Sequence, residues 1–220
     1  MLPIVYEDRA LIVIDKPAFL PTSGRTLDDP ECAQHRLARQ LGEHVWAVHQ
    51  IDATTTGLNL FVRRKSAVAV FVHKLKQGIK QYIALVDGRP EWSALRIDAP
   101  IGWDEASRAW AVTPEGRTAV SDAERVAVGP HAAAVAVRIA TGRTHQVRIH
   151  MASVGHPLLG DHRYGGRTDP ARTAAGLERP MLHAYRLRID GVPELVAPLA
   201  ADFVAAAGAE GLSLSGWAGA

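Results

Sequence analysis

The sequence predicts an α+β fold with a mixed, mainly antiparallel sheet, and three observations support this expectation. Short apolar runs of strand-forming residues recur along the chain. Between residues 108 and 140 such runs follow one another with only Gly- and Pro-containing turns between them, which is typical of antiparallel strands. Other segments carry apolar residues at helical spacing and end at glycine.

Size and composition bound the class of protein. The 220 residues, 47% of them hydrophobic, suffice for one well-buried domain. The single cysteine, Cys32, excludes an intrachain disulfide framework and favours a reducing, cytoplasmic setting. The first residues lack the features of a signal peptide, and no apolar stretch reaches membrane-spanning length. The formal net charge of +2 only weakly favours a nucleic-acid partner.

The N-terminal part predicts a hairpin followed by a helix. Two apolar runs within residues 4–15 flank Glu7-Asp8-Arg9, and Pro17 ends the second run because proline cannot continue a central strand. Asp28, Asp29 and Pro30 are expected to start a helix that ends at Leu41, with Gly42 as its stop.

The next segment predicts strand, strand, helix and strand. The runs 45–48 and 58–62 are short and β-friendly. Ser66 can cap a helix over residues 67–77, whose apolar face we expect to be core. Residues 79–88 follow as a strand that places Tyr82 and Ala84 on one face.

The C-terminal half predicts mostly strands around one further helix. Residues 98–102 form a turn, and the expected strands cover residues 108–112, 117–128 and 133–140. Thr144 can cap a helix running to Val154, with Val147 on its buried edge. A loop is expected over residues 156–165, followed by an exposed connection over residues 167–180. A strand over residues 182–189 and a last helix beginning at residues 201–203 complete the chain.

Asp52 lies in a Thr-rich turn between two predicted strands, within His49-Gln50-Ile51-Asp52-Ala53-Thr54-Thr55-Thr56-Gly57-Leu58. A carboxylate on such a rigid turn can act on a ligand, or it can simply accept hydrogen bonds from the amide groups of its own turn. The local sequence by itself favours the second interpretation.

The pattern His-x-x-Asp-x-x-Thr-x-Gly-Leu resembles the catalytic motif of the RluA-type family of RNA pseudouridine synthases. Further stretches resemble that family in the same order along the chain. They include Gly-Arg-Thr-His-Gln, which begins at residue 142, and Leu-His-Ala-Tyr-Arg-Leu, which begins at residue 182. The matching stretches are residues 13–21, 79–88, 98–102, 142–165, 182–187 and 198–203. Together they run from about residue 4 to residue 203. The resemblance implies the pseudouridine synthase fold, with helices and loops around a central cleft.

The resemblance also implies the reaction and the partner. A uridine in RNA is detached at nitrogen 1, turned and rejoined through carbon 5, so neither a cofactor nor a metal is needed. His145, His150, His156 and His162 have no cysteine among them and spacings that do not converge, so we expect no metal site. The implied partner is a stem-loop of ribosomal or transfer RNA.

Three catalytic residues carry over from the family. Asp52 acts on the target nucleotide, and three roles stay open for it: attack on the base, attack on the sugar, or removal of a sugar proton. Arg143 would pair with Asp52 and favour its ionised form, or would instead contact an RNA phosphate. Tyr82 would stack on the uracil and assist proton removal, or would be an ordinary core aromatic.

A wider set of residues is assigned to the substrate. His49, Gln50 and Thr56 belong to the catalytic motif, and Leu58 and Val147 are apolar walls or core residues. Because the target nucleotide must be flipped out at a cost of a few kcal/mol, we expect phosphate contacts to offset that cost. That role falls loosely to four basic residues: Arg63, Arg64, Lys65 and Arg148.

Gln50 is the main departure from the family pattern. Relatives usually carry arginine there, which can wedge into the space left by a flipped base, and glutamine lacks its charge and most of its stacking plane. An alternative to the active enzyme is therefore a catalytically inactive RNA-binding relative of the same fold. A carboxylate-pair glycoside hydrolase has less support, because no second acid is marked as a partner of Asp52.

The expected organisation is a single catalytic domain over residues 1–207 and a mobile tail over residues 208–220. The chain starts directly in the catalytic fold, so substrate choice is expected to come from that domain or from the RNA's own shape. We expect a monomeric, cytoplasmic protein.

Overall fold

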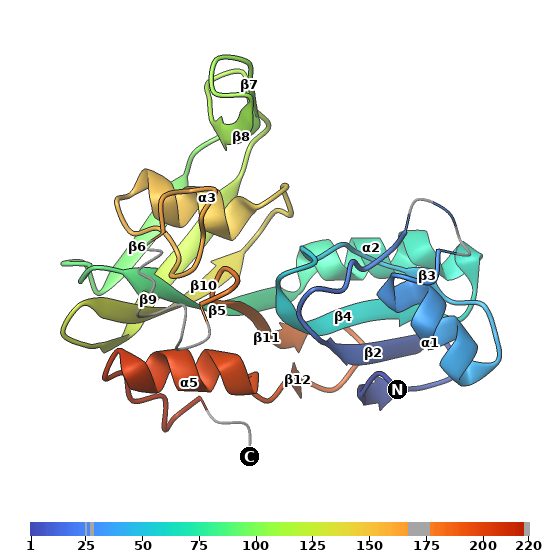
Figure 1. Ribbon diagram of the computed structural model, residues 1–220. Coiled ribbons are helices and arrows are strands. Elements are labelled where there is room, and N and C mark those ends of the chain that lie inside the picture. Colours follow the sequence, from blue (N-terminus) through green and yellow to red (C-terminus); the bar gives the residue numbers. More distant parts are fainter. Residues whose placement is uncertain (25, 27–28, 167–176, 218–220) are drawn as a thin grey trace. The chain divides into compact units, whose positions relative to one another are not determined.

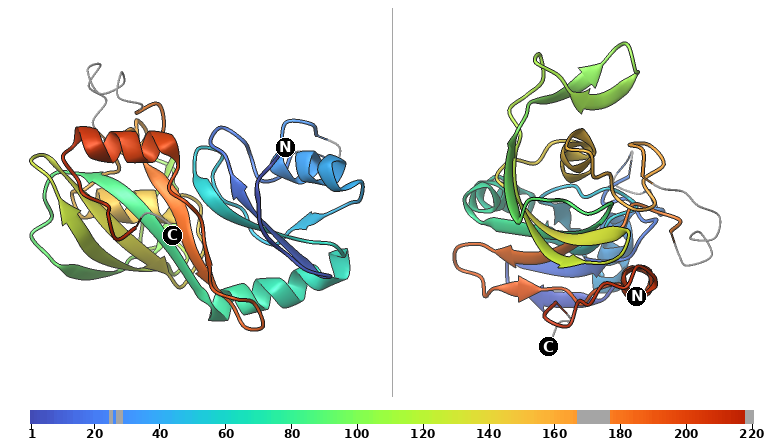
Figure 2. Two further views of the ribbon diagram at one scale, coloured as in Figure 1. Left: turned by 90° about the horizontal axis from the view of Figure 1, so that it is seen from below. Right: turned by 90° about the vertical axis from the view of Figure 1, so that its left-hand side faces the viewer.

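The computed structural model describes residues 1–24, 26, 29–166 and 177–217. These residues form two compact units (Figures 1 and 2). Unit 1 comprises Met1–Lys80 and Ala184–Ala200, and unit 2 comprises Gln81–His183 and residues 201–217. Each unit combines strands with helices, and every strand pair whose register is given below is antiparallel, in agreement with the α+β prediction.

The sheet of unit 1 contains the predicted N-terminal hairpin. Its strands lie in the order β1 (Ile4–Glu7), β2 (Leu11–Lys16), β4 (Thr56–Val62) and β11 (Leu182–Arg188). The short strand β3 (Trp46–Ala47) pairs with β4, and β12 (Leu195–Val196) pairs with β11. The predicted strands around the Asp52 turn are thus confirmed as β3 and β4, which pair antiparallel with Trp46 opposite Val62.

Two helices cover opposite faces of this sheet. Leu11 and Val13 of β2 pack with Phe71 and Leu75 of α2 (Val68–Gln77). Ile12 and Ile14 alternate to the other face and pack with Leu37 of α1 (Ala33–Leu41). The run from Leu11 to Ile14 is therefore apolar throughout because the strand is buried on both faces.

Two predicted helix starts in unit 1 are wrong. α1 begins at Ala33, because Cys32 is the N-cap and its Sγ accepts the backbone N–H of His35. Asp28, where the helix was expected to begin, lies outside the described residues, and Asp29 and Pro30 precede the helix. Ser66 lies inside a 3-10 turn, Lys65–Ala67, and no side chain caps α2. The predicted stop at Gly42 is confirmed, with φ of 72°.

The main sheet of unit 2 has the largely buried strand β10 (Ala132–Ile139) in its interior. Its order is β5 (Ile79–Asp87), β10, β9 (Val120–Val128) and β6 (Ala94–Asp98), all antiparallel. Residues 82–86 of β5 and residues 132–137 of β10 are continuous apolar runs because they are buried inside the sheet. β6 was not predicted, because its alternation of small, charged and apolar residues gives only a weak strand signal.

The turn predicted at residues 98–102 is shorter, with only residues 99–100 outside strands, and the strand predicted at residues 108–112 is confirmed as part of a separate hairpin. β7 (Ile101–Asp104) pairs with β8 (Ala109–Val112), and Trp103 stands opposite Trp110. The two indole rings meet edge to face, with centroids 6.3 Å apart. Ile101 at the base of the hairpin packs with Ile149 of α3 (Gln146–Ser153).

The last helix, α5 (Ala201–Ala209), is confirmed, and an ion pair between the buried Arg179 and the partly exposed Asp202 holds it in unit 2. The guanidinium of Arg179 donates to both carboxylate oxygens of Asp202, at 2.7 and 2.9 Å. Arg179 and Leu177 are buried, which corrects the expectation of an exposed connection at residues 177–180. Residues 167–176 of that predicted connection lie outside the described part of the chain.

The described residues contain neither a helix suited to span a membrane nor a cluster suited to hold a metal ion. Among them no helix has the length and apolar character needed to cross a membrane. Nor do three or more His, Cys, Asp or Glu side chains among the described residues gather in a way that could hold a metal ion.

Candidate active site

Asp52 lies in a tight turn whose flanking residues are buried. The backbone carbonyl of Asp52 accepts the N–H of Thr55 at 3.0 Å, which closes the turn just before β4. Ile51 and Thr55 are buried, whereas Asp52 is only partly buried. The turn therefore holds the backbone on both sides of a carboxylate that stays accessible to a substrate.

A buried lysine anchors this turn to the segment that follows β2. The ammonium of Lys16 donates to the carbonyls of Pro17 and Leu20 at 2.8 Å and to that of Ala53 at 3.1 Å. Its side chain is fully buried, so these charge-assisted bonds replace the water that the ammonium loses. The residue after Asp52 is thereby fixed to β2.

Thr22 holds the other side of the turn. Its hydroxyl donates to the carbonyl of Ile51 and accepts the N–H of the same residue, both at 3.2 Å. The residues immediately before and after Asp52 are thus both tied to residues 16–22. That segment overlaps the stretch at residues 13–21 that resembles the family. Its contacts indicate that this stretch holds the Asp52 turn in position.

Gly57 brings β4 close to a strand from the far end of the sequence. Its φ is +100°, and a Cβ at this position would lie 2.3 Å from the carbonyl oxygen of Ala184 in β11. Only glycine satisfies both conditions. The catalytic-type motif and the Leu-His-Ala-Tyr-Arg-Leu stretch are therefore in backbone contact within unit 1.

His49 is held neutral beside β4. Its Nε2 accepts the backbone N–H of Leu60 at 3.4 Å, a role open only to an unprotonated nitrogen. Burial, with a smaller contribution from the charge of Lys80, lowers the pKa of His49 to about 4. Asn59 also donates to the carbonyl of His49 at 3.2 Å. His49 therefore supports the strand that follows the Asp52 turn.

The remaining motif residues of unit 1 divide between surface and core. Gln50 is exposed, and its Nε2 donates to the hydroxyl of Ser23 at 2.8 Å. Thr56 and Leu58 are buried, and Leu58 belongs to the apolar cluster beneath α2. The core interpretation of Leu58 thus has direct structural support.

The three consecutive basic residues after β4 differ in their surroundings. Arg63 makes ion pairs with Glu7 and Glu43, and its Nε donates to the carbonyl of Asp8. These partners already satisfy its guanidinium, so its position does not favour phosphate binding. Arg64 and Lys65 are exposed and available to a polyanion.

Tyr82 and Arg143 belong to unit 2. Tyr82 lies on β5 opposite Val137 of β10 and is 9% exposed. The Nε of Arg143 donates to the carbonyl of Thr118 at 2.9 Å, and this side chain is partly buried. Because Asp52 belongs to unit 1, the convergence of these three residues on one nucleotide stays a prediction.

The start of α3 differs from the prediction. Thr144 does not cap the helix: the N-cap is His145, with φ of +53° and no capping hydrogen bond from its side chain. Gln146 organises the turn instead, because its Oε1 accepts from the hydroxyl of Thr141 and the N–H of Arg143. The ring of His145 is also hydrogen-bonded to the hydroxyl of Tyr164 at 2.8 Å.

Arg148 and Val147 are both buried on α3. The guanidinium of Arg148 binds both carboxylate oxygens of Asp161, at 2.7 and 2.9 Å, and lies over the ring of Tyr164. This arrangement contradicts the exposed position that a phosphate contact needs, so Arg148 is better described as a structural residue. Val147 fits either a wall or a core role.

Sequence reasoning missed two residues that position the Asp52 turn, Lys16 and Thr22. Lys16 lies within a stretch that was singled out, but its burial was not expected. Thr22 gave no usable signal, because its partner Ile51 is 29 residues away.

Comparison with known proteins places the chain in a family. Residues 10–153 match the family model described as RNA pseudouridylate synthase. Ribosomal large subunit pseudouridine synthase C of Vibrio vulnificus is 35% identical over 191 residues, covering 84% of this chain and 60% of that relative. An uncharacterized RNA pseudouridine synthase of Mycobacterium bovis is 32% identical over 217 residues, covering 91% of this chain and 70% of that relative. The chain thus spans about two thirds of the length of these curated relatives.

Solved structures agree in fold. Human RNA pseudouridylate synthase domain containing 1 superposes with a TM-score of 0.74 at 27% identity, covering 90% of this chain and 83% of that one. Human RNA pseudouridylate synthase domain containing 4 gives a TM-score of 0.79 at 24% identity, covering 96% and 94%. The match to the family model over residues 10–153, with the 32% identity to the Mycobacterium bovis relative over 91% of this chain, shows that the chain belongs to the RNA pseudouridylate synthase family.

Proposed function

We propose that this protein isomerises a specific uridine in structured RNA to pseudouridine, with Asp52 as the essential catalytic residue. The observation that carries the proposal is the Asp52 turn: an accessible carboxylate whose neighbours on both sides are fixed by Lys16 and Thr22. Membership of the family supports the reaction class. The proposed target is a stem-loop of ribosomal or transfer RNA, and relatives named for the large ribosomal subunit favour ribosomal RNA.

The reaction needs no external reagent. The bond between ribose C1′ and N1 of uracil breaks, the detached base turns, C1′ bonds to C5, and the proton lost from C5 is balanced by a proton that N1 gains. Asp52 would start this sequence by acting on the base or the sugar, in its ionised form. Tyr82 would stack on the uracil and take part in removing the C5 proton. Arg143 would orient the Asp52 carboxylate when both meet the nucleotide.

The nucleotide must leave its stack before this chemistry, which costs a few kcal/mol. The exposed pair Arg64 and Lys65 supports the proposal that phosphate contacts offset part of that cost. Gln50 would occupy the place of the usual arginine, and its hydrogen bond to Ser23 holds its amide ready for a base edge.

The test is to incubate the protein with bulk ribosomal and transfer RNA and to map pseudouridine at nucleotide resolution. We expect new pseudouridine at one or a few sites with the wild type. Asp52→Asn should bind the same RNA with similar affinity and form no product, because the amide keeps the shape but removes the charge.

The control for this test is Thr54→Ser, a mild change in the same turn, which should keep activity. Wild-type turnover in Asp52→Asn would refute the assignment of Asp52. A wild type that binds RNA but modifies none of it would favour the inactive RNA-binding alternative. An unchanged rate in Arg143→Ala at every pH would refute its pairing with Asp52.

A further inference from the structure

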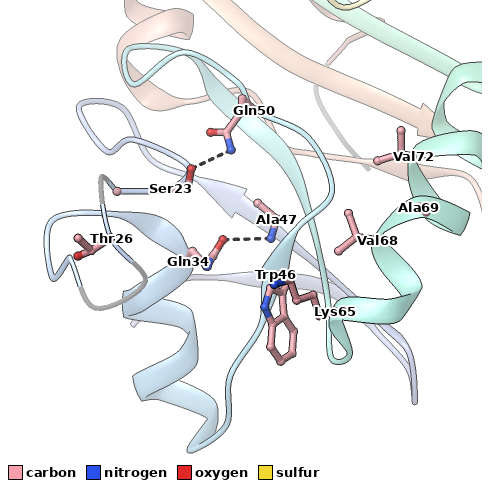
Figure 3. A pocket seen from close by; sticks show the side chains of 11 residues that line it. Ser23, Thr26, Gln34, Trp46, Ala47, Gln50, Lys65, Val68, Ala69 and Val72 are labelled. Atoms are coloured by element: carbon pink, nitrogen blue, oxygen red, sulfur yellow. Dashed lines mark hydrogen bonds between the residues drawn. The ribbon is translucent and has the colours of Figure 1, made fainter.

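A pocket of about 620 Å³ opens on unit 1 beside the Asp52 turn (Figure 3). One side is formed by Val68, Ala69 and Val72 of α2. Trp46 and Lys65 lie toward one end and Gln50 with Ser23 toward the other. Gln50 is two residues before Asp52, so the pocket and the catalytic turn share one short segment of backbone.

The end formed by Trp46 and Lys65 combines an aromatic ring with a positive charge. Trp46 is partly buried on β3, where its pairing with Val62 and its packing against the core fix the backbone beneath the indole. Lys65 is exposed on the 3-10 turn before α2. An indole that is already ordered can stack on a base at little entropic cost, and a neighbouring ammonium suits a phosphate.

Hydrogen-bonding groups that are held in place lie at the Gln50 end and, beside Ala47, in the middle of the pocket. The Nε2 of Gln50 donates to Ser23, which leaves the Oε1 of Gln50 as an acceptor. The Oε1 of Gln34 accepts the backbone N–H of Ala47 at 3.1 Å, which fixes that amide and leaves its Nε2 as a donor. A donor and an acceptor on ordered amides match the edge of a nucleobase.

The charge and the volume of the pocket limit the kinds of ligand that it can bind. Lys65 is the one charged side chain among the described residues that line the pocket, so the pocket favours an anion over a cation. Its volume lies within the range of roughly 300–1,000 Å³ that is usual for small-ligand sites, and it exceeds what a base alone would fill. A base with its sugar and phosphate fits the chemistry of both ends.

We propose that this pocket binds a second, unpaired nucleotide of the RNA substrate, close in sequence to the uridine that Asp52 modifies. The base stacks on Trp46, its edge meets the Gln50 and Gln34 amides, and its phosphate lies near Lys65. This inference rests on the proposed function for the identity of the RNA, and it assigns part of the substrate choice to unit 1. It also gives Gln50 a role in recognising the bound base through hydrogen bonds with its amide, which an arginine would make differently.

The first experiment compares two matched charge substitutions on α2. Ala69 lines the pocket, whereas the next residue, Val70, is 54% exposed and is not among the residues lining it. The probe is a labelled RNA hairpin with a uridine-rich loop, titrated at fixed salt. Ala69→Glu should raise the Kd about 5- to 100-fold, the range of one lost base stack. Val70→Glu adds the same charge outside the pocket and should raise the Kd about twofold at most.

A second experiment tests the named contacts. Irradiation of the complex with hairpin RNA carrying 5-iodouridine in the loop should link a loop nucleotide to Trp46, as mapped by mass spectrometry. Trp46→Phe keeps a stacking ring and should bind more tightly than Trp46→Ala. Lys65→Ala should reduce the salt slope of binding by about 1, whereas Lys76→Ala, an exposed lysine outside the lining, should change it less.

The outcomes separate this inference from the proposed function. Equal binding by Ala69→Glu and Val70→Glu, with no crosslink at Trp46, would overturn the pocket even if the wild type makes pseudouridine. A wild type that makes no pseudouridine, but binds RNA in a Trp46- and Ala69-dependent way, would overturn the proposed function and support the pocket. Failure of the wild type to bind the hairpin or bulk RNA would overturn both.

Discussion

Lys16 and His49 are both basic residues of unit 1, but they differ in charge: Lys16 acts as an ammonium ion and His49 as a neutral imidazole. Lys16 is fully buried, and its ammonium is satisfied by three backbone carbonyls, which fixes the residue after Asp52. His49 is held neutral, because its Nε2 serves as an acceptor and burial disfavours its charged form. One residue stabilises the turn as a cation, and the other stabilises β4 only while it is uncharged.

The low pKa of His49 predicts a pH dependence of stability. Its pKa is about 4 in the folded protein, below the ordinary value of 6.5, so the unfolded chain takes up the proton first. The contribution is fully present above pH 6.5 and is lost as the pH falls from there toward 4. The loss should reach roughly 2–3 kcal/mol in the free energy of unfolding.

The measurement is urea unfolding across that pH range. His49→Gln, which keeps an acceptor for the Leu60 N–H, should flatten the slope between pH 6.5 and 4. His73→Gln changes an exposed histidine on α2 and should retain the wild-type slope. Parallel slopes in the wild type and His49→Gln would show that His49 is not the group responsible.

At the scale of elements, β4 brings the Asp52 turn and β11 together. Leu58 and Leu60 pack beneath α2, while Phe61 faces the cluster around α1. At the start of β4, Gly57 leaves no room for a side chain against Ala184 of β11. The turn is therefore positioned by a strand that is buried on both faces and in close contact with its neighbour.

Substitution of Gly57 should be far more costly than that of another glycine in the left-handed region. In Gly57→Ala the new Cβ would meet backbone atoms of Ala184 and the φ of +100° would be strained, for a destabilisation of about 3 kcal/mol or more. Gly42→Ala at the end of α1 also has a positive φ, but its Cβ would meet nothing within 4 Å, so we expect about 1 kcal/mol.

Denaturant unfolding of both variants measures this difference. Gly57→Ala should also lose activity on RNA under conditions where it is folded. The Asp52 turn leads directly into β4, so a shift of β4 away from Ala184 would move the turn as well. Equal losses of stability in the two variants would contradict the close contact between β4 and β11.

At the scale of the whole molecule, unit 2 is completed by segments that are distant in sequence. Arg179, which precedes β11, pairs with Asp202 at the start of α5, and its side chain is completely buried. Gly129, after β9, lies against Glu210 and Leu212 beyond α5. Leu212 is 6% exposed, so the packed part of unit 2 extends past residue 207.

The Arg179–Asp202 pair predicts a stability loss that depends on pH. Burial alone would raise the pKa of Asp202, but hydrogen bonds and the charge of Arg179 more than offset it, so the pKa lies below its ordinary value. Stability from this group is present above about pH 4 and is lost as the pH falls through the folded pKa. Asp202→Asn should cost about 2–4 kcal/mol at pH 7, because Arg179 stays buried without its counter-charge.

The deficit of Asp202→Asn relative to the wild type should shrink as the pH falls below about 4, because Asp202 takes up a proton first in the unfolded chain and, at the lower folded pKa, in the folded protein. Glu194→Gln, which alters an exposed pair with Arg186 in unit 1, provides the control and should cost less than about 1 kcal/mol. A constant deficit at every pH would contradict the electrostatic origin of the effect.

The N-terminal hairpin, the strands around Asp52, the helix stop at Gly42 and the last helix were all predictable, because each depends on neighbours within a few residues. Family membership was also predictable, since the motifs are contiguous. The wrong predictions are the helix caps at Ser66 and Thr144, where the local sequence gave only a weak signal. Ser66 instead lies in a 3-10 turn before α2, and the Gln146 side chain organises the turn before α3.

The sequence by itself thus determined the family, the fold class and the place of Asp52 in a turn between strands. Only the tertiary structure decided which basic residues face solvent: Arg148 and Arg63 have carboxylate partners, whereas Lys65 is exposed and lines a pocket. It also decided that Lys16 and Thr22 hold the Asp52 turn. The physical reason is that burial and ion pairing depend on residues brought together by folding, and no pattern of near neighbours encodes them.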